Sequence, residues 1–113
     1  MSRSWVLFLR DMLEGAAKIE RFTAGKDLAG FAADAMAYDA VIRNLELLGE
    51  AAKNIPEEIR RRYPQVDWRS IAGLRDVLAH SYFALDDATL WRIIREDVRR
   101  IAPELERIAR ENP

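Results

Sequence analysis

Apolar residues recur at helical spacing through most of this chain, and this periodicity limits the fold more than any other feature. The clearest run lies near the C-terminus, with successive spacings of four, four, three, four and three residues: Leu90, Ile94, Val98, Ile101, Leu105 and Ile108. Such spacing is typical of a helix that packs in a bundle or coiled coil. No segment alternates between apolar and polar residues for long enough to predict a strand. The chain is therefore expected to be all-α.

The same pattern predicts two amphipathic helices in the first half of the chain. The first begins near Trp5 and ends at about residues 23–25. The second is expected to be one long helix that is capped by Asp27 and stops before Pro56, because proline disfavours a helical conformation in the residue before it. Residues 56–60 then start a short helical turn with proline in the first position, and Pro64 ends it.

Two more helices are predicted in the second half. Asp67 can cap a helix over Trp68–His80, and either Asp86 or Asp87 can cap the last one. Pro103 lies inside the last helix and should kink it, because proline removes one backbone hydrogen bond. Together these segments predict an up-down bundle of four to five helices.

Length and composition are consistent with one helical domain over residues 1–113 in the cytoplasm. The chain has no cysteine, which excludes disulfides and thiolate metal sites. The apolar run at residues 5–9 is too short for a signal peptide or a membrane span. A net charge of −1 argues against a strongly basic nucleic-acid binder.

Charge is nevertheless unevenly distributed along the chain. From Arg60 onward there are eleven arginines and nine acidic residues (+2), against seven basic and ten acidic residues before it (−3). The excess arginines either form surface salt bridges or include a local patch that faces phosphate. They lie at Arg60, Arg61, Arg62, Arg69 and Arg75, and then at Arg92, Arg95, Arg99 and Arg100.

The octapeptide over residues 75–82 holds the most chemically able side chains. Arg75 offers a permanent cation with a planar set of donors that suits phosphate oxygens. His80, the only histidine, has an unperturbed pKa near neutrality, so it can give or take a proton. The two groups suffice for phosphodiester cleavage without a metal ion or cofactor. The alternative is a surface histidine beside a tyrosine, Tyr82, that packs.

Helical geometry separates the two candidate catalytic groups. Arg75 and His80 are five residues apart, so their side chains diverge by about 140° in an ideal helix. Either the helix unwinds before His80 or a second copy of the chain supplies the missing partner. Asp76 lies four residues before His80 and could orient the imidazole, or it could pair with a neighbouring arginine instead.

Polar residues also interrupt the apolar second helix. Arg43 and Glu50 lie two turns apart on one face, which predicts an ion pair or a link to the helix that carries Arg75. With Asn44 they form either a buried polar network or part of the lining of a cleft. Gly49 and Gly73 are expected to permit close approach between helices.

Three segments in this order resemble the HepT-like toxins of the HEPN superfamily: residues 42–52, 68–76 and 80–82, with residues 90–94 also fitting. The resemblance implies a helical bundle that forms a homodimer, with the two arginine-histidine motifs meeting in a cleft at the interface. It implies a metal-independent ribonuclease acting on RNA as the toxin of a toxin–antitoxin pair. The implied partner is a minimal nucleotidyltransferase antitoxin.

Carried over to this chain, the resemblance makes Arg75 and His80 catalytic and Tyr82 the tyrosine to which the antitoxin adds AMP. Asp76 replaces an asparagine that the family often has after the motif arginine. The fixed negative charge of Asp76 is expected to weaken RNA binding. Two alternatives remain at this point: a non-catalytic helical partner that docks a nucleotidyltransferase and presents its substrate, and a plain helical oligomer.

Overall fold

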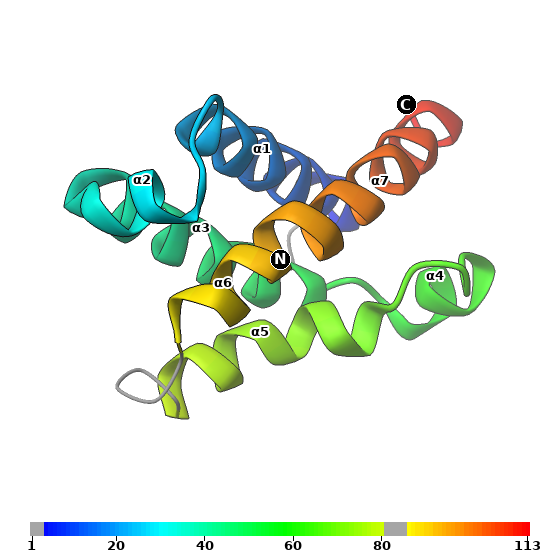
Figure 1. The fold of residues 1–113 in the computed structure, drawn as a ribbon. Helices are drawn as coiled ribbons and strands as arrows, with labels where there is room; N and C mark the ends of the chain where they lie inside the picture. The colour runs from blue at the N-terminus through cyan, green and yellow to red at the C-terminus, as the bar shows by residue number, and fades with distance from the viewer. Residues whose placement is uncertain (1–3, 81–85) are drawn as a thin grey trace.

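Four helices of 13 or 19 residues make up most of the chain (Figure 1). The computed structural model describes residues 4–80 and 86–113, without the side chains at positions 77, 79 and 80. In chain order the elements are α1 (Trp5–Thr23), α2 (Leu28–Ala33), α3 (Ala35–Lys53), α4 (Glu57–Arg62), α5 (Trp68–His80), α6 (Asp87–Arg92), the π-helical segment η1 (Ile93–Val98) and α7 (Arg99–Glu111). No strand occurs in the two described ranges, so the all-α prediction is confirmed.

Helix α3 occupies the centre of the bundle. It packs against α1 and also against α5, while α7 packs against α1 (Figure 1). Large apolar side chains at these contacts are fully buried, among them Leu9 and Met12 of α1, Leu45 and Leu48 of α3, and Leu105 of α7. Burial of each contributes about 1.5–3 kcal/mol relative to exposure, so these contacts hold the helices together.

Aspartate caps decide where several helices begin. Asp67 accepts a hydrogen bond from the Ser70 amide at 3.2 Å, and Asp86 accepts one from the Thr89 amide at 2.6 Å. Both caps were predicted, and α5 has the predicted bounds. The hydrogen bond from the Ser70 hydroxyl, and then the one from the Ser70 amide, lower the pKa of Asp67, because each favours the ionised carboxylate.

The prediction of one long second helix is wrong, because Asp34 divides it into α2 and α3. The Asp34 backbone is extended, and its Oδ1 accepts a hydrogen bond from the Ala37 amide at 3.0 Å. That bond, together with the nearby Lys26 ammonium, lowers the pKa of Asp34. Short polar side chains compete with the helix for backbone donors, and here the aspartate starts a new helix instead of continuing the old one.

The last helical stretch departs from α-geometry upstream of its proline. Helix α7 continues through Pro103, whereas residues 93–98 form the π-helical segment η1. A π-helical turn holds more residues than an α-helical turn. This wider turn accommodates the two successive four-residue spacings that place Leu90, Ile94 and Val98 in the core.

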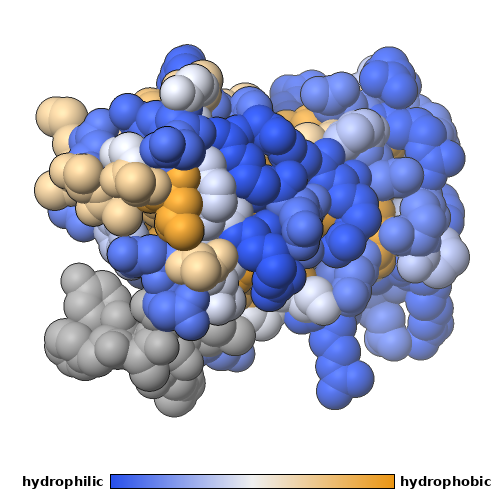
Figure 2. All heavy atoms as spheres, in the orientation of Figure 1, coloured by the Kyte–Doolittle hydropathy of each residue, from blue (hydrophilic) through white to orange (hydrophobic). Residues whose placement is uncertain are grey.

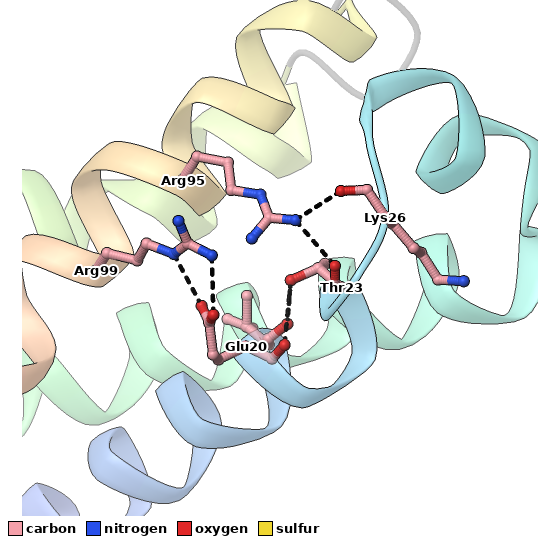
Figure 3. Close-up of polar contacts among 6 residues, drawn as sticks. Glu20, Thr23, Lys26, Arg95 and Arg99 are labelled. Atoms are coloured by element: carbon pink, nitrogen blue, oxygen red, sulfur yellow. Dashed lines mark hydrogen bonds and ion pairs between the residues drawn. The ribbon is translucent and has the colours of Figure 1, made fainter.

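Arg95 of η1 ties this segment to the end of α1 (Figure 3). Its Nη2 donates hydrogen bonds to the carbonyl oxygens of Thr23 at 2.9 Å and Lys26 at 2.8 Å. One turn further on, Arg99 makes a two-point contact with Glu20 of α1, at 2.9 and 3.1 Å. The hydrogen bonds from Arg99 lower the pKa of Glu20, so both arginines dock the C-terminal stretch on α1.

The surface drawn in Figure 2 is mainly hydrophilic, and apolar residues gather at the end where α2 lies. In residues 4–80 and 86–113, no helix is both long and apolar enough to cross a membrane.

Candidate functional site

The predicted motif lies on α5, where this helix comes closest to α3. Gly49 of α3 makes the approach possible, because a Cβ there would stand 3.0 Å from the Ile71 carbonyl oxygen and 3.1 Å from the Arg75 nitrogen. Both neighbours are backbone atoms of α5, which side-chain rotation cannot move aside. The close approach predicted at Gly49 is thus confirmed, and it places the Arg75 backbone directly against α3.

Arg75 forms an ion pair across this contact. Its Nη1 lies 3.1 Å from Oε2 of Glu50 on α3, and the two side chains are 55% and 51% exposed. The predicted link between Glu50 and the motif helix is therefore present. An exposed pair of this kind contributes little to stability, about 0–1 kcal/mol. A guanidinium has five donors, so Arg75 is held in position and can still contact a phosphate.

A second ion pair lies one helical turn along the same contact. Lys53 Nζ of α3 is 3.3 Å from Oδ1 of Asp76, and Asp76 is 62% exposed. Asp76 was expected to orient His80 or to pair with an arginine; among the described side chains it forms an ion pair with a lysine, and its contact with His80 stays a prediction. Lys53 was not among the predicted site residues. Its signal was present in the sequence, because Lys53 follows Glu50 by three residues and so lies on the same helical face.

The other two motif residues are only partly described. His80 is the last residue of α5, but its side chain lies outside the described part, as does Tyr82 altogether. The expected contact between Asp76 and the imidazole, and the position of the tyrosine, stay predictions. Helix α5 does extend to His80, so the 140° divergence from Arg75 applies to the backbone positions.

Arg43 and Asn44 do not join Glu50 in one buried network. Arg43 is exposed, whereas Asn44 is buried and its Nδ2 donates to the Ala40 carbonyl oxygen of its own helix at 2.8 Å. Asn44 and Glu50 line a hollow of about 350 Å³ between α3 and α1, to which α1 contributes Phe8, Asp11, Glu14, Gly15 and Lys18. Asn44 and Glu50 therefore line the same hollow, whereas Arg43 does not; that these residues line the cleft of a dimer stays a prediction.

Gly73 does not serve the close helix approach that was predicted for it. An added Cβ would meet no atom of the described residues within 4 Å. Its neighbour one turn along, Asp76, is exposed, and so is Arg69 one turn before it. The glycine therefore lies outside the close contact between α5 and α3.

Metal-ligating side chains of the described residues do not gather at this site. Across the described ranges, no three His, Cys, Asp or Glu residues lie close enough together to hold a metal ion. The described groups that can act on a substrate here are the Arg75 guanidinium and the side chains that hold it.

Comparison with known proteins identifies the family. The family model described as "Ribonuclease HepT-like" matches residues 12–110. A protein of Thermococcus cleftensis named "Probable ribonuclease HepT" is 39% identical over 96% of this chain and 98% of its own length. A Methanocaldococcus jannaschii protein named "Putative RNase MJ1380" is 42% identical over 88% of this chain and 91% of its own. No solved structure gave a significant match. The chain belongs to the HepT-like ribonuclease family.

Proposed function

We propose that this protein is a metal-independent ribonuclease of the cytoplasm, with Arg75 and His80 as its catalytic residues. The observation that carries the proposal is the Arg75 guanidinium, which Glu50 holds at 3.1 Å while more than half of the side chain remains exposed. Family membership supports RNA as the substrate.

The proposed reaction needs a base, an acid and a cation. The ribose 2′-hydroxyl attacks the adjacent phosphorus and loses its proton to one histidine, while the bond from phosphorus to the 5′-oxygen breaks and that oxygen takes a proton from a second histidine. Arg75 stabilises the charge that builds on the phosphoryl oxygens. The products are a 2′,3′-cyclic phosphate and a 5′-hydroxyl. Each chain has one histidine, so the scheme requires two copies.

The exposed face of α3 supports a homodimer that would supply the second copy. Met36 and Leu47 on this face are 80% and 42% exposed. Arg43 and Glu50 are exposed on the same face and have opposite charge. In an antiparallel pair of α3 helices centred near Leu47, Arg43 would lie opposite Glu50 of the partner subunit. This face is therefore self-complementary, as a two-fold interface requires, and it adjoins Arg75 through Glu50.

Mixing wild type with a variant tests the dimer. Arg75→Ala and His80→Ala should each lower RNA cleavage about a hundredfold or more, because a single transition-state donor contributes about 3–4 kcal/mol. Because the scheme uses one histidine from each chain, a heterodimer of wild type and His80→Ala lacks one of the two. In an equal mixture with exchanged subunits, about a quarter of the dimers keep both histidines, so activity should fall to about a quarter of that of wild type at the same total concentration.

The controls separate the outcomes. Both variants should keep the wild-type circular dichroism spectrum, and cleavage should persist in EDTA. A mixture that keeps about half of that activity would show that each chain acts with its own histidine alone, which contradicts the two-copy scheme. Full activity of either single variant would contradict the catalytic assignment and favour the non-catalytic partner of a nucleotidyltransferase.

Control by a minimal nucleotidyltransferase antitoxin completes the proposal. AMP added to Tyr82 brings a phosphate two residues from His80, and Arg75 would be drawn to that phosphate in place of RNA. Mass spectrometry after incubation with such an enzyme, ATP and magnesium should show added AMP on wild type and none on Tyr82→Phe. Equal labelling of both proteins would place the modification elsewhere.

A further inference from the structure

A groove between α4 and the first turn of α5 collects three arginines away from the site described above. The groove has a volume of about 460 Å³ and is lined by Arg60 and Arg61 of α4, by Arg69 of α5, and by residues of the connection between them. Figure 1 shows α4 near one end of α5, and the other end of α5 is its last residue, His80. The groove and the motif therefore lie at opposite ends of one helix.

Two of these arginines make no ion pair or hydrogen bond with a described residue, although Arg69 is close enough to Asp67 to interact with it electrostatically. Arg61 pairs with Glu57 at 2.7 Å, and Asp67 is engaged by the amide and hydroxyl of Ser70 at 3.2 and 2.8 Å. Neither Arg60 nor Arg69 makes an ion pair or a hydrogen bond with any described residue. The acidic groups that line the groove are thus already in use, and two guanidinium groups are available to a ligand.

Arg60 has a buried hydrogen-bond donor that is not used. Its Nε is the buried side-chain nitrogen or oxygen that lacks a hydrogen-bond partner in the described part of the chain. A buried donor without a partner is unfavourable, because it has lost its hydrogen bonds to water. An anion bound in the groove would contact the Arg60 guanidinium. Phosphate suits a guanidinium because it accepts two parallel hydrogen bonds.

The exposed face of α5 connects this groove to the motif. At about 100° per residue, positions 69, 73, 76 and 80 fall within about 60° of one another, and they span about 16 Å along the helix. Gly73 stands midway, with no atom within 4 Å of the place where a Cβ would be. A polynucleotide backbone can approach the helix there. Asp76 lies on the same path, and Lys53 offsets its negative charge at 3.3 Å.

We propose that the α4–α5 groove binds a phosphate of the RNA substrate through Arg60 and Arg69, and that the strand then follows the Gly73 face of α5 to the motif. This inference rests on the proposed ribonuclease function. The distance along α5 corresponds to a few nucleotides of single strand, which is within the range that one protein surface engages. The groove is thus a second anchoring position, separate from the phosphate that is cleaved.

Binding of an uncleavable oligonucleotide tests the groove independently of catalysis. A 2′-O-methyl RNA lacks the nucleophile, so its dissociation constant reports binding whether or not the protein cuts RNA. The double variant Arg60→Gln/Arg69→Gln should raise this constant about tenfold. It should also reduce the slope of log K against log salt by about 0.7, the value for one phosphate contact on a single strand. Arg10→Gln is the matched control, because Arg10 is an exposed arginine of α1 outside the groove.

Two further measurements distinguish anchoring from misfolding and from catalysis. Gly73→Leu should keep the fold, since the position is open, and should weaken oligonucleotide binding by obstructing the strand. On cleavable RNA, the double variant should raise KM and leave kcat nearly unchanged, because its contacts are equal in the ground and transition states. Unchanged affinity and salt slope in the double variant would overturn the proposal. Unchanged oligonucleotide binding, together with weaker binding of a nucleotidyltransferase, would show that the groove binds a protein partner instead of RNA. Absence of cleavage with intact, groove-dependent binding would refute only the ribonuclease function.

Discussion

One substitution at two glycines should have opposite effects on stability. Alanine is favoured over glycine inside a helix by about 1 kcal/mol. At Gly73 the new Cβ meets nothing within 4 Å, so Gly73→Ala should raise the free energy of unfolding by nearly the full 1 kcal/mol. For a chain of 113 residues, a gain of 1 kcal/mol corresponds to a rise in Tm of about 4 °C.

At Gly49 the same propensity gain meets a steric cost. The Cβ would lie 3.0 and 3.1 Å from two backbone atoms of α5, so α3 and α5 must separate slightly. Overpacking of this kind costs about 1–3 kcal/mol. Gly49→Ala should therefore leave stability unchanged or lower it by up to about 2 kcal/mol, and it should displace the backbone of Arg75.

Urea denaturation followed by circular dichroism measures both variants against wild type. The scans should be repeated at several protein concentrations, because subunit association would add to the apparent stability. Stabilisation of Gly49→Ala by the same amount as Gly73→Ala would refute the close contact between α3 and α5. Destabilisation of Gly73→Ala at low concentration would refute the open face of α5.

Two more predictions concern the docking of η1 and α7 on α1. Arg95→Met should lower the free energy of unfolding by about 2 kcal/mol, because a charged donor to two carbonyl oxygens is lost. Arg92 makes only an exposed ion pair at 3.7 Å. Arg92→Met should therefore change the free energy of unfolding by less than about 0.5 kcal/mol. The pKa values of Glu20 and Asp67 are lower in the folded chain than in the unfolded chain. The two carboxylates therefore contribute fully to stability above about pH 5, and this contribution is lost as the pH falls through their folded pKa values. Thermal scans should show the loss, and Glu20→Gln should have a flatter pH profile.

Local patterns were enough to predict the helical class and most helix ends. Apolar spacing identified the core residues of the last helix, and the caps at Asp67 and Asp86 follow from short-range hydrogen bonds to amides three residues on. Spacing on one helix also predicted that Glu50 would reach the motif helix. These features depend on residues within one or two turns of each other, so a sequence can encode them directly.

The division of the second helix shows where local patterns fail. The apolar spacing continues through Asp34, so periodicity alone favoured one helix. The side-chain hydrogen bond to the Ala37 amide outweighs that pattern, and the chain turns so that Phe31 stacks on Tyr38 and contacts Trp91. Trp91 lies sixty positions after Phe31 in the chain, so local periodicity cannot predict that contact.

Sequence by itself determined that this chain is helical, where its caps lie and which family motif it carries, because each of these is written in neighbouring residues. Tertiary structure alone decided which of two glycines is enclosed, that Lys53 pairs with Asp76, and that the buried Nε of Arg60 lacks a hydrogen-bond partner among the described residues. Those outcomes depend on which helices come together and at what distance. Helical spacing specifies which face of a helix is apolar, but the partner on that face follows only from the packing of the whole bundle.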